Sequence, residues 1–169
     1  MDRSDTIELG VLGLLAEGEA TVESLQKRFN HNFGRHQFAG RGTLDPTLDR
    51  LREEGYVIGS QVYSLTDQGR ERLRSLLREP VAAVDDPEHR PHLLVKLGFL
   101  HHLPAEGRDA ELAHLEDQFH EARNAWLETA RMHNEEVDHD GFRLELVDLT
   151  VELLDTHLRW VRRLRDSAE

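Results

Sequence analysis

The stretch Arg41–Val57, RGTLDPTLDRLREEGYV, constrains the fold most, because it specifies one helix together with both of its ends. Thr43 is suited to cap the N-terminus with its hydroxyl, Pro46 to lie in the first turn, and Gly55 to follow the last turn in a left-handed conformation. Three leucines at helical spacing form one apolar stripe: Leu44, Leu48 and Leu51. A short helix that is buried on one face only is typical of the recognition helix of a helix-turn-helix domain.

The other face of this helix, and the residues just before it, carry the candidate DNA contacts. Arginines, a glycine and small hydroxyls near a helix N-terminus can approach phosphates and the edges of bases. The predicted DNA-binding residues are Arg35, Arg41, Gly42, Thr43, Thr47 and Arg50. For any one of these arginines alone, a solvated surface position is an equally good interpretation.

The charge distribution is compatible with a nucleic-acid partner in the first half only. The chain has a net charge of −12, but residues 1–79 carry 11 basic and 13 acidic residues, a net charge of −2. Residues 80–169 carry 10 basic and 20 acidic residues, a net charge of −10. A local basic segment in a chain that is otherwise acidic could orient the molecule on a phosphate backbone.

The helices and strands predicted before and after this helix follow one another in the order found in a known fold. A nearly all-apolar helix is expected over residues 6–17, and a second helix is expected after Thr21 as its cap. Two short strands around a tight turn are predicted over residues 56–58 and 62–65, and Thr66 begins a helix that ends at Pro80. Three helices, a hairpin and a closing helix in this order describe a winged helix-turn-helix.

Three motifs in that order carry a family resemblance: GVLGLLAEG, RGTLDPTLDRLREEGYV and VYSLTDQGRERL. The segment they span, roughly residues 7–78, resembles the winged-helix domain of the PadR family of bacterial transcriptional regulators. The second half, with LLVKLGFL and a long tryptophan-bearing last helix, is similar to the helical C-terminal domain of the larger PadR proteins. The resemblance implies a homodimeric DNA-binding regulator, usually a repressor, that is released from its operator by a signal.

The sequence departs from the family pattern at the DNA-binding surface. Asp45 lies where the recognition helix commonly has a tyrosine, and the wing is reduced to about Gly59-Ser60-Gln61 without its usual basic residue. A carboxylate can accept a hydrogen bond from cytosine or repel phosphate. These departures keep a second interpretation open, in which the winged helix is a protein-interaction adaptor with little DNA binding.

The second half of the chain is predicted to be helical. Residues 80–91 contain three prolines and form a linker, so the predicted domains are residues 1–79 for DNA binding and 92–169 for dimerisation and regulation. Helices are expected over residues 92–103, 106–136 and 142–165. The predicted fold class is therefore mainly α with a small β-hairpin, combining an N-terminal winged helix-turn-helix with a C-terminal antiparallel helical dimerisation domain.

The last helix has two apolar stripes, and a single antiparallel partner can cover only one of them. An apolar surface this wide predicts a twofold homodimer, although a monomer that folds both stripes into one bundle is the alternative. The predicted dimerisation residues are Leu146, Leu149, Leu153, Leu154, Leu158, Trp160 and Val161. Trp126 and Trp160 are candidates for a small-molecule effector pocket, with core packing as the alternative role.

Other classes of function find little support in the sequence. The chain lacks cysteine, a phosphate-binding glycine loop and the common catalytic motifs, which argues against an enzyme and predicts no cofactor. Eleven histidines leave a metal-responsive regulator as an alternative, but their spacing predicts no metal site. The absence of a long apolar run predicts a cytoplasmic protein without a membrane partner. The expected macromolecular partner is double-stranded DNA with a palindromic operator.

Overall fold

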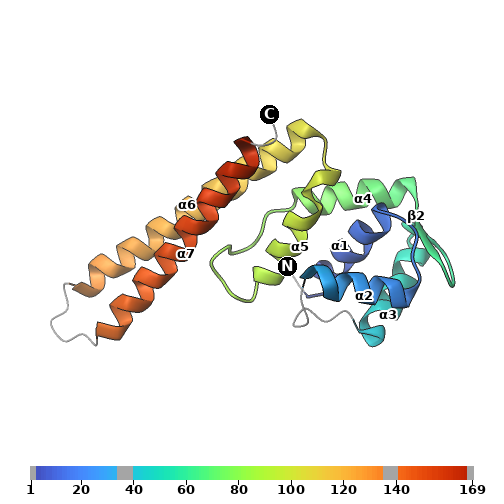
Figure 1. Ribbon diagram of the computed structural model, residues 1–169, viewed down its shortest axis with the longest axis horizontal. Helices are drawn as coiled ribbons and strands as arrows, with labels where there is room; N and C mark the ends of the chain where they lie inside the picture. Colours follow the sequence, from blue (N-terminus) through green and yellow to red (C-terminus); the bar gives the residue numbers. More distant parts are fainter. Residues whose placement is uncertain (1–2, 34–39, 135–140, 167–169) are drawn as a thin grey trace. The chain divides into compact units, whose positions relative to one another are not determined.

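The computed structural model describes residues 3–33, 40–134 and 141–166, which form two compact units. The first unit comprises residues 1–81 and 88–104, and the second comprises residues 82–87 and 105–169. The elements of the first unit are α1 (Arg3–Ala16), α2 (Val22–Phe33), α3 (Arg41–Glu53), β1 (Val57–Gly59), β2 (Tyr63–Leu65), α4 (Asp67–Arg78), α5 (Arg90–Phe99) and the 3-10 helix η1 (Leu100–His102). The second unit consists of α6 (Ala105–Asn134) and α7 (Gly141–Asp166) (Figure 1). The predicted fold class, mainly α with one β-hairpin, is confirmed.

Helix α1 is the centre of the first unit and contacts α2, α3, α4, α5 and β2. Its apolar residues are almost completely buried: Ile7, Leu9, Val11, Leu12, Leu14 and Leu15. The α2 helix approaches α1 so closely that a Cβ atom on Gly10 would lie 2.1 Å from a ring carbon of Phe29. The helix is therefore buried on more than one side, as its nearly all-apolar sequence implies.

The hairpin is tied to the turn between α1 and α2. Strands β1 and β2 are antiparallel, with Val57 opposite Leu65 and Gly59 opposite Tyr63. Ala20 then extends this sheet by one residue, because it exchanges both backbone hydrogen bonds with Tyr63, at N–O distances of 3.0 and 2.9 Å. No sequence signal distinguishes this bridge from an ordinary connection between two helices.

Helix α3 ends as the sequence predicts. Gly55 has a φ of +79°, and its N–H donates to the carbonyl of Arg52 while the N–H of Tyr56 donates to the carbonyl of Leu51. This pair of bonds is the Schellman arrangement, which satisfies carbonyls that a helix end leaves unpaired. Thr66 joins the end of α3 to the start of α4: its hydroxyl oxygen accepts from the N–H of Gly69 at 3.0 Å and lies 2.8 Å from the carbonyl oxygen of Gly55, to which it can donate.

Replacing Gly55 by alanine should lower the free energy of unfolding by about 1 kcal/mol, because a Cβ atom disfavours the left-handed conformation. The matched control is Gly42→Ala in the first turn of the same helix, where a Cβ atom would meet nothing within 4 Å. That control should be neutral or slightly stabilising, because alanine has the higher helix propensity. Urea titrations followed by circular dichroism measure both, and equal destabilisation would contradict the role assigned to Gly55.

The predicted domain boundary at residues 80–91 is wrong in one respect, because α5 belongs to the first unit rather than to the C-terminal helices. The ring of Phe99 lies 5.5 Å from that of Phe33 in an edge-on contact. The buried Lys96 Nζ donates to the carbonyl of Glu79 at 2.5 Å, and His92 shares a 3.2 Å hydrogen bond with the hydroxyl of Thr6. After residue 104 the chain therefore leaves the first unit for the last time.

The second unit is a pair of long antiparallel helices (Figure 1). One stripe of α7 is buried against α6 and includes Val147, Leu154, Leu158 and Val161. Near one end, Glu116 accepts hydrogen bonds from Arg162 at 2.5 Å and from Arg165 at 2.8 Å. The bond from Arg162, and then that from Arg165, lowers the pKa of Glu116 below its usual value. Among the described residues, no helix combines the length and apolar character needed to cross a membrane.

Candidate nucleic-acid interface

The first turn of α3 is exposed to solvent. The helix begins two or three residues earlier in the chain than the sequence predicts. The helix starts at Arg41, and its N-cap residue is Gly40, whose carbonyl accepts from the N–H groups of Thr43 and Leu44 at 2.9 Å. Thr43 was predicted as the cap but lies in the first turn, so that prediction is wrong. Pro46 consequently lies inside the helix, at an exposed position where the carbonyl four residues earlier can be hydrated.

Three predicted DNA-binding residues lie on this open turn, and two of them are exposed. Arg41 and Gly42 are exposed, and Thr43 is half-buried beside them. The Arg41 guanidinium donates a hydrogen bond to Glu23, which lies in the first turn of α2 and is itself exposed. The first N–H groups of any helix have no partner within the helix, so this turn offers donors as well as a guanidinium. Arg35 lies outside the described residues.

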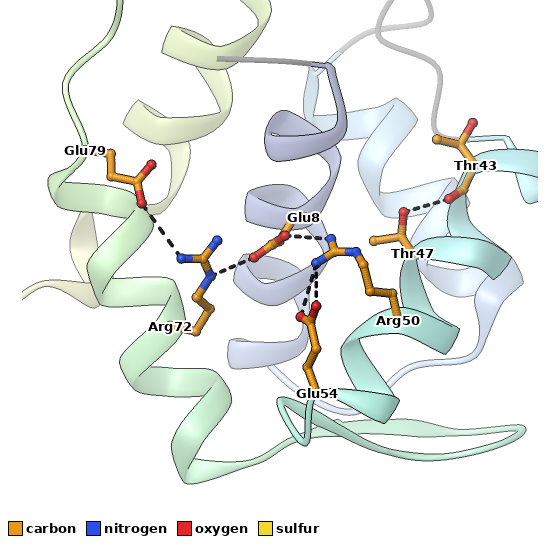
Figure 2. Close-up of polar contacts among 7 residues, drawn as sticks. All are labelled: Glu8, Thr43, Thr47, Arg50, Glu54, Arg72 and Glu79. Carbon is orange, nitrogen blue, oxygen red and sulfur yellow. Dashed lines mark hydrogen bonds and ion pairs between the residues drawn. The ribbon is translucent and has the colours of Figure 1, made fainter.

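Thr47 faces inward rather than outward, and the prediction of its orientation is wrong. Its relative exposure is only 8%, and its hydroxyl donates to the carbonyl of Thr43 at 2.8 Å (Figure 2). The reason is helical periodicity, because position 47 is three residues after Leu44 and four before Leu51, and it therefore lies on the leucine stripe. The sequence contained this signal.

The guanidinium of Arg50 pairs with two carboxylates, Glu8 of α1 and Glu54 at the end of α3 itself. Its Nη2 donates to Oε2 of Glu8 at 2.6 Å, and its Nη1 lies 3.1 Å from Oε2 of Glu54. The other oxygen of Glu8 accepts from Nε of Arg72 in α4 at 2.8 Å, and Figure 2 shows Glu8 between the two guanidinium groups. We call Glu8, Arg50 and Arg72 the Glu8 clamp. It links α1, α3 and α4 through a carboxylate whose side chain is only 4% exposed.

Electrostatics favour this arrangement. Burial alone would lower the pKa of each guanidinium in the clamp, but hydrogen bonding to Glu8 and its negative charge raise both pKa values above the usual one. Both arginines therefore stay charged. Sequence patterns did not single out Glu8, although it is the one carboxylate among the mostly apolar residues 6–16 and was in that sense a visible signal.

The basic segment identified in the sequence is largely paired within the domain. This segment runs from Lys27 to Arg52 and contains six basic residues. Four of them bond to carboxylates: Arg28 to Glu17, Arg41 to Glu23, Arg50 to Glu8 and Glu54, and Arg52 to Asp49. The exposed charged residues on α3 itself are Arg41, Asp45, Asp49, Arg52 and Glu53, two positive and three negative. A phosphate backbone would have to replace some of these carboxylates as the partner of the arginines.

The hairpin offers no cationic side chain, because residues 57–65 contain neither lysine nor arginine. Its exposed side chains include two large apolar ones, Ile58 and Val62. Contacts of this hairpin with phosphates would therefore depend on backbone N–H groups and small polar side chains. The apolar character of its surface instead fits contact with a protein or with sugar and base edges.

The residues predicted for dimerisation divide into two sets. Leu154, Leu158 and Val161 are buried against α6 of the same chain, so they are already covered and the prediction that they form a free interface is wrong. Leu146, Leu149 and Leu153 are 57, 53 and 44% exposed, and Trp160 is half-buried. We call the three exposed leucines the open α7 stripe. One of the two predicted stripes thus packs within the chain and the other is uncovered.

The structure does not bring the two tryptophans together. Nε1 of Trp126 donates to a carboxylate oxygen of Asp85 at 2.8 Å. Because Arg123 pairs with Asp155 and Arg162 with Glu116, Trp160 lies at the level of residue 118 of α6. The two tryptophan positions are therefore separated by about 12 Å along the helix axis. An open pocket of about 520 Å³ at the end of α6 and α7 is lined by charged residues, including Asp109, Glu116 and Arg162, and neither tryptophan lines it.

Comparison with known proteins gives only distant similarity. No protein-family model matches the chain, and no curated protein matches it. Among solved structures, Bacillus subtilis PadR in complex with p-coumaric acid is 17% identical, with a TM-score of 0.45 and coverage of 99% of this chain and 98% of that chain. The PadR-like transcriptional regulator BC1756 from Bacillus cereus is 18% identical, with a TM-score of 0.40 and coverage of 98% and 97%. The Vibrio cholerae virulence activator AphA is 21% identical, with a TM-score of 0.42 and coverage of 95% and 96%. Identities and TM-scores of this size assign no function.

Proposed function

We propose that this protein is a PadR-like, sequence-specific DNA-binding transcriptional regulator that acts as a homodimer on a palindromic operator. The observation that carries the proposal is the open first turn of α3, on a helix whose other side is fixed to α1 by three buried leucines and the Glu8 clamp. A recognition helix must expose its N-terminal turn while the rest of the helix is held rigidly.

In this proposal the first turn of α3 enters the major groove. Arg41 exchanges its partner Glu23 for a phosphate or a base edge, and Gly42 lets the backbone approach closely because it carries no side chain. Arg50 positions the helix through Glu8 instead of reading DNA. Two such helices in a dimer would address half-sites about 34–36 Å apart, one turn of B-DNA.

The homodimer follows from the open α7 stripe. Three leucines on one helix face remain exposed in the single chain, and an apolar face of this kind is usually covered by a partner. A second copy of the same helix covers it most simply, since a twofold interface pairs each patch with itself. A signal that acts on the helical unit would change the spacing of the two recognition helices, and we expect repression to be relieved in this way.

Arg41→Ala should weaken operator binding by roughly 5- to 150-fold, because a base-reading arginine contributes about 1–3 kcal/mol. Fluorescence anisotropy with a site selected from random DNA, at two salt concentrations, measures this loss. If Arg41 instead contacts phosphate, affinity should fall equally for all sequences and the salt dependence should become weaker.

The matched control is Arg131→Ala, which removes another exposed, ion-paired arginine, from α6. This variant should bind the operator like the wild type. Wild-type affinity of Arg41→Ala would exclude the first turn of α3 as the contact surface, and failure of random-DNA selection to yield a twofold motif would contradict the proposed function itself.

A protein-interaction adaptor is the second candidate, supported by the apolar hairpin surface at Ile58 and Val62 and by the pairing of four arginines within the domain. An adaptor would bind DNA weakly and without sequence preference. The same anisotropy titration separates the two, because a regulator binds its selected site tightly and loses affinity steeply as salt increases.

A further inference from the structure

Three potential metal ligands, Glu17, His101 and His102, come together in the first unit. Glu17 follows α1 directly, and the two histidines end η1. One ligand atom from each residue lies within 4.8 Å of the others, and Nε2 of His101 is 4.0 Å from Oε1 of Glu17. The sequence predicts no metal site, because the residues that meet here are 84 and 85 positions apart.

The carboxylate is oriented for a ligand. Oε2 of Glu17 accepts a hydrogen bond from Arg28 at 2.6 Å, while Oε1 faces His101. Carboxylates that bind metals are commonly held by such a partner, which fixes their direction. Arg28 therefore occupies one oxygen of Glu17 and leaves the other available.

The histidines offer ring nitrogens at close range. Their ring centroids are 4.1 Å apart, and the ring of His102 stacks on Phe99 with a centroid distance of 6.1 Å. Nε2 of His102 is buried and has no hydrogen-bond partner in the described part of the chain. A metal ion would not have to displace an existing bond from that nitrogen.

We propose that Glu17, His101 and His102 bind one divalent transition-metal ion, with Zn²⁺ as the best match. Two imidazole nitrogens and one carboxylate oxygen form a common zinc ligand set, and water can complete the tetrahedron. Zinc bonds of about 2.0–2.2 Å place neighbouring ligand atoms roughly 3.4 Å apart. The three side chains need to close by roughly an ångström from the present spacing, which rotation of the exposed Glu17 and His101 allows.

The bound ion would join the turn after α1 to η1 within one unit, and would therefore stabilise that unit in proportion to its affinity. This inference does not depend on DNA binding, since its ligands lie outside α3 and the hairpin.

The test is calorimetric titration of the full chain with Zn²⁺, paired with thermal unfolding with and without the ion. The wild type should bind one equivalent at this site and unfold at a higher temperature, and a chelator should reverse the shift. The double variant His101→Gln/His102→Gln should lose at least roughly tenfold in affinity, since even groups that only support a ligand contribute about that much. Glu17→Gln should weaken binding as well.

His114→Gln is the matched control, because it removes an exposed histidine of α6 and leaves the cluster intact. This variant should bind Zn²⁺ with wild-type affinity. That result would distinguish binding at this cluster from nonspecific binding of Zn²⁺ to any of the eleven histidines of the chain. Thermal unfolding without metal verifies that the double variant is folded. Absence of saturable Zn²⁺ binding by the wild type, or equal affinity in the folded double variant, would overturn the proposal.

Discussion

The double substitution Leu149→Glu/Leu153→Glu is expected to convert the proposed dimer into a monomer and to abolish tight operator binding. Both leucines lie on the open α7 stripe, where about half of each side chain is still exposed in the single chain. A partner that covers the remaining area would gain about 1 kcal/mol from each leucine, or about 4 kcal/mol from the four in a twofold interface. The variant would also bring four carboxylates together, so the dimer dissociation constant should rise by roughly a thousandfold or more.

Sedimentation velocity over a range of concentrations measures this change, and anisotropy with the selected operator measures its consequence. Leu94→Glu is the matched control, since Leu94 is 44% exposed, as is Leu153, but lies in α5 of the first unit. This control should remain dimeric. A wild-type chain that sediments as a monomer at all concentrations would remove the basis for paired recognition helices.

Glu8→Gln should lower the free energy of unfolding by about 2 kcal/mol, a typical contribution for hydrogen bonds to a buried charged group. The reason is geometric, because each oxygen of Glu8 accepts from a different guanidinium group, Nη2 of Arg50 and Nε of Arg72. An amide has only one acceptor oxygen, and its NH2 group would face the donors of one arginine. Because both arginines are partly exposed, each can turn to water, which keeps the loss below that of a fully buried ion pair.

Glu71→Gln provides the comparison, since Glu71 pairs with Arg74 on the exposed face of α4. Removing a surface ion pair of this kind should change stability by less than about 0.5 kcal/mol. Urea titrations at pH 7 report both values. Equal effects of the two substitutions would show that the Glu8 clamp contributes no more than an ordinary surface pair.

Local features of the fold could be predicted from the sequence, because the groups that determine them are close together in the chain. The end of α3 depends on Gly55, which follows its C-cap. The start of α4 depends on the hydroxyl of Thr66, which accepts a hydrogen bond from the N–H of Gly69, three residues later. Leucine spacing was sufficient to identify the buried face of α3.

Features that join distant segments could not be predicted. Glu8 is 42 residues from Arg50 and 64 from Arg72, so no local pattern connects them. The assignment of α5 failed for the same reason. The prolines of residues 80–91 indicate a connector, but they do not show that Phe99 packs on Phe33 rather than on the last two helices. At the candidate site, the exposure of each side chain could not be predicted from the sequence alone. Of the predicted contacts that the structure describes, Arg41 and Gly42 are the exposed ones.

The dual role of Thr66 has a consequence for how this module can evolve. One hydroxyl joins Gly55, in the turn after α3, to the first turn of α4, so both ends of the β1–β2 hairpin are anchored at its base. Insertions between Gly59 and Val62 would therefore lengthen the loop without disturbing either flanking helix, and loop-closure entropy increases only slowly with length. The hairpin is thus the segment in which a basic arm could be added while the scaffold stays constant.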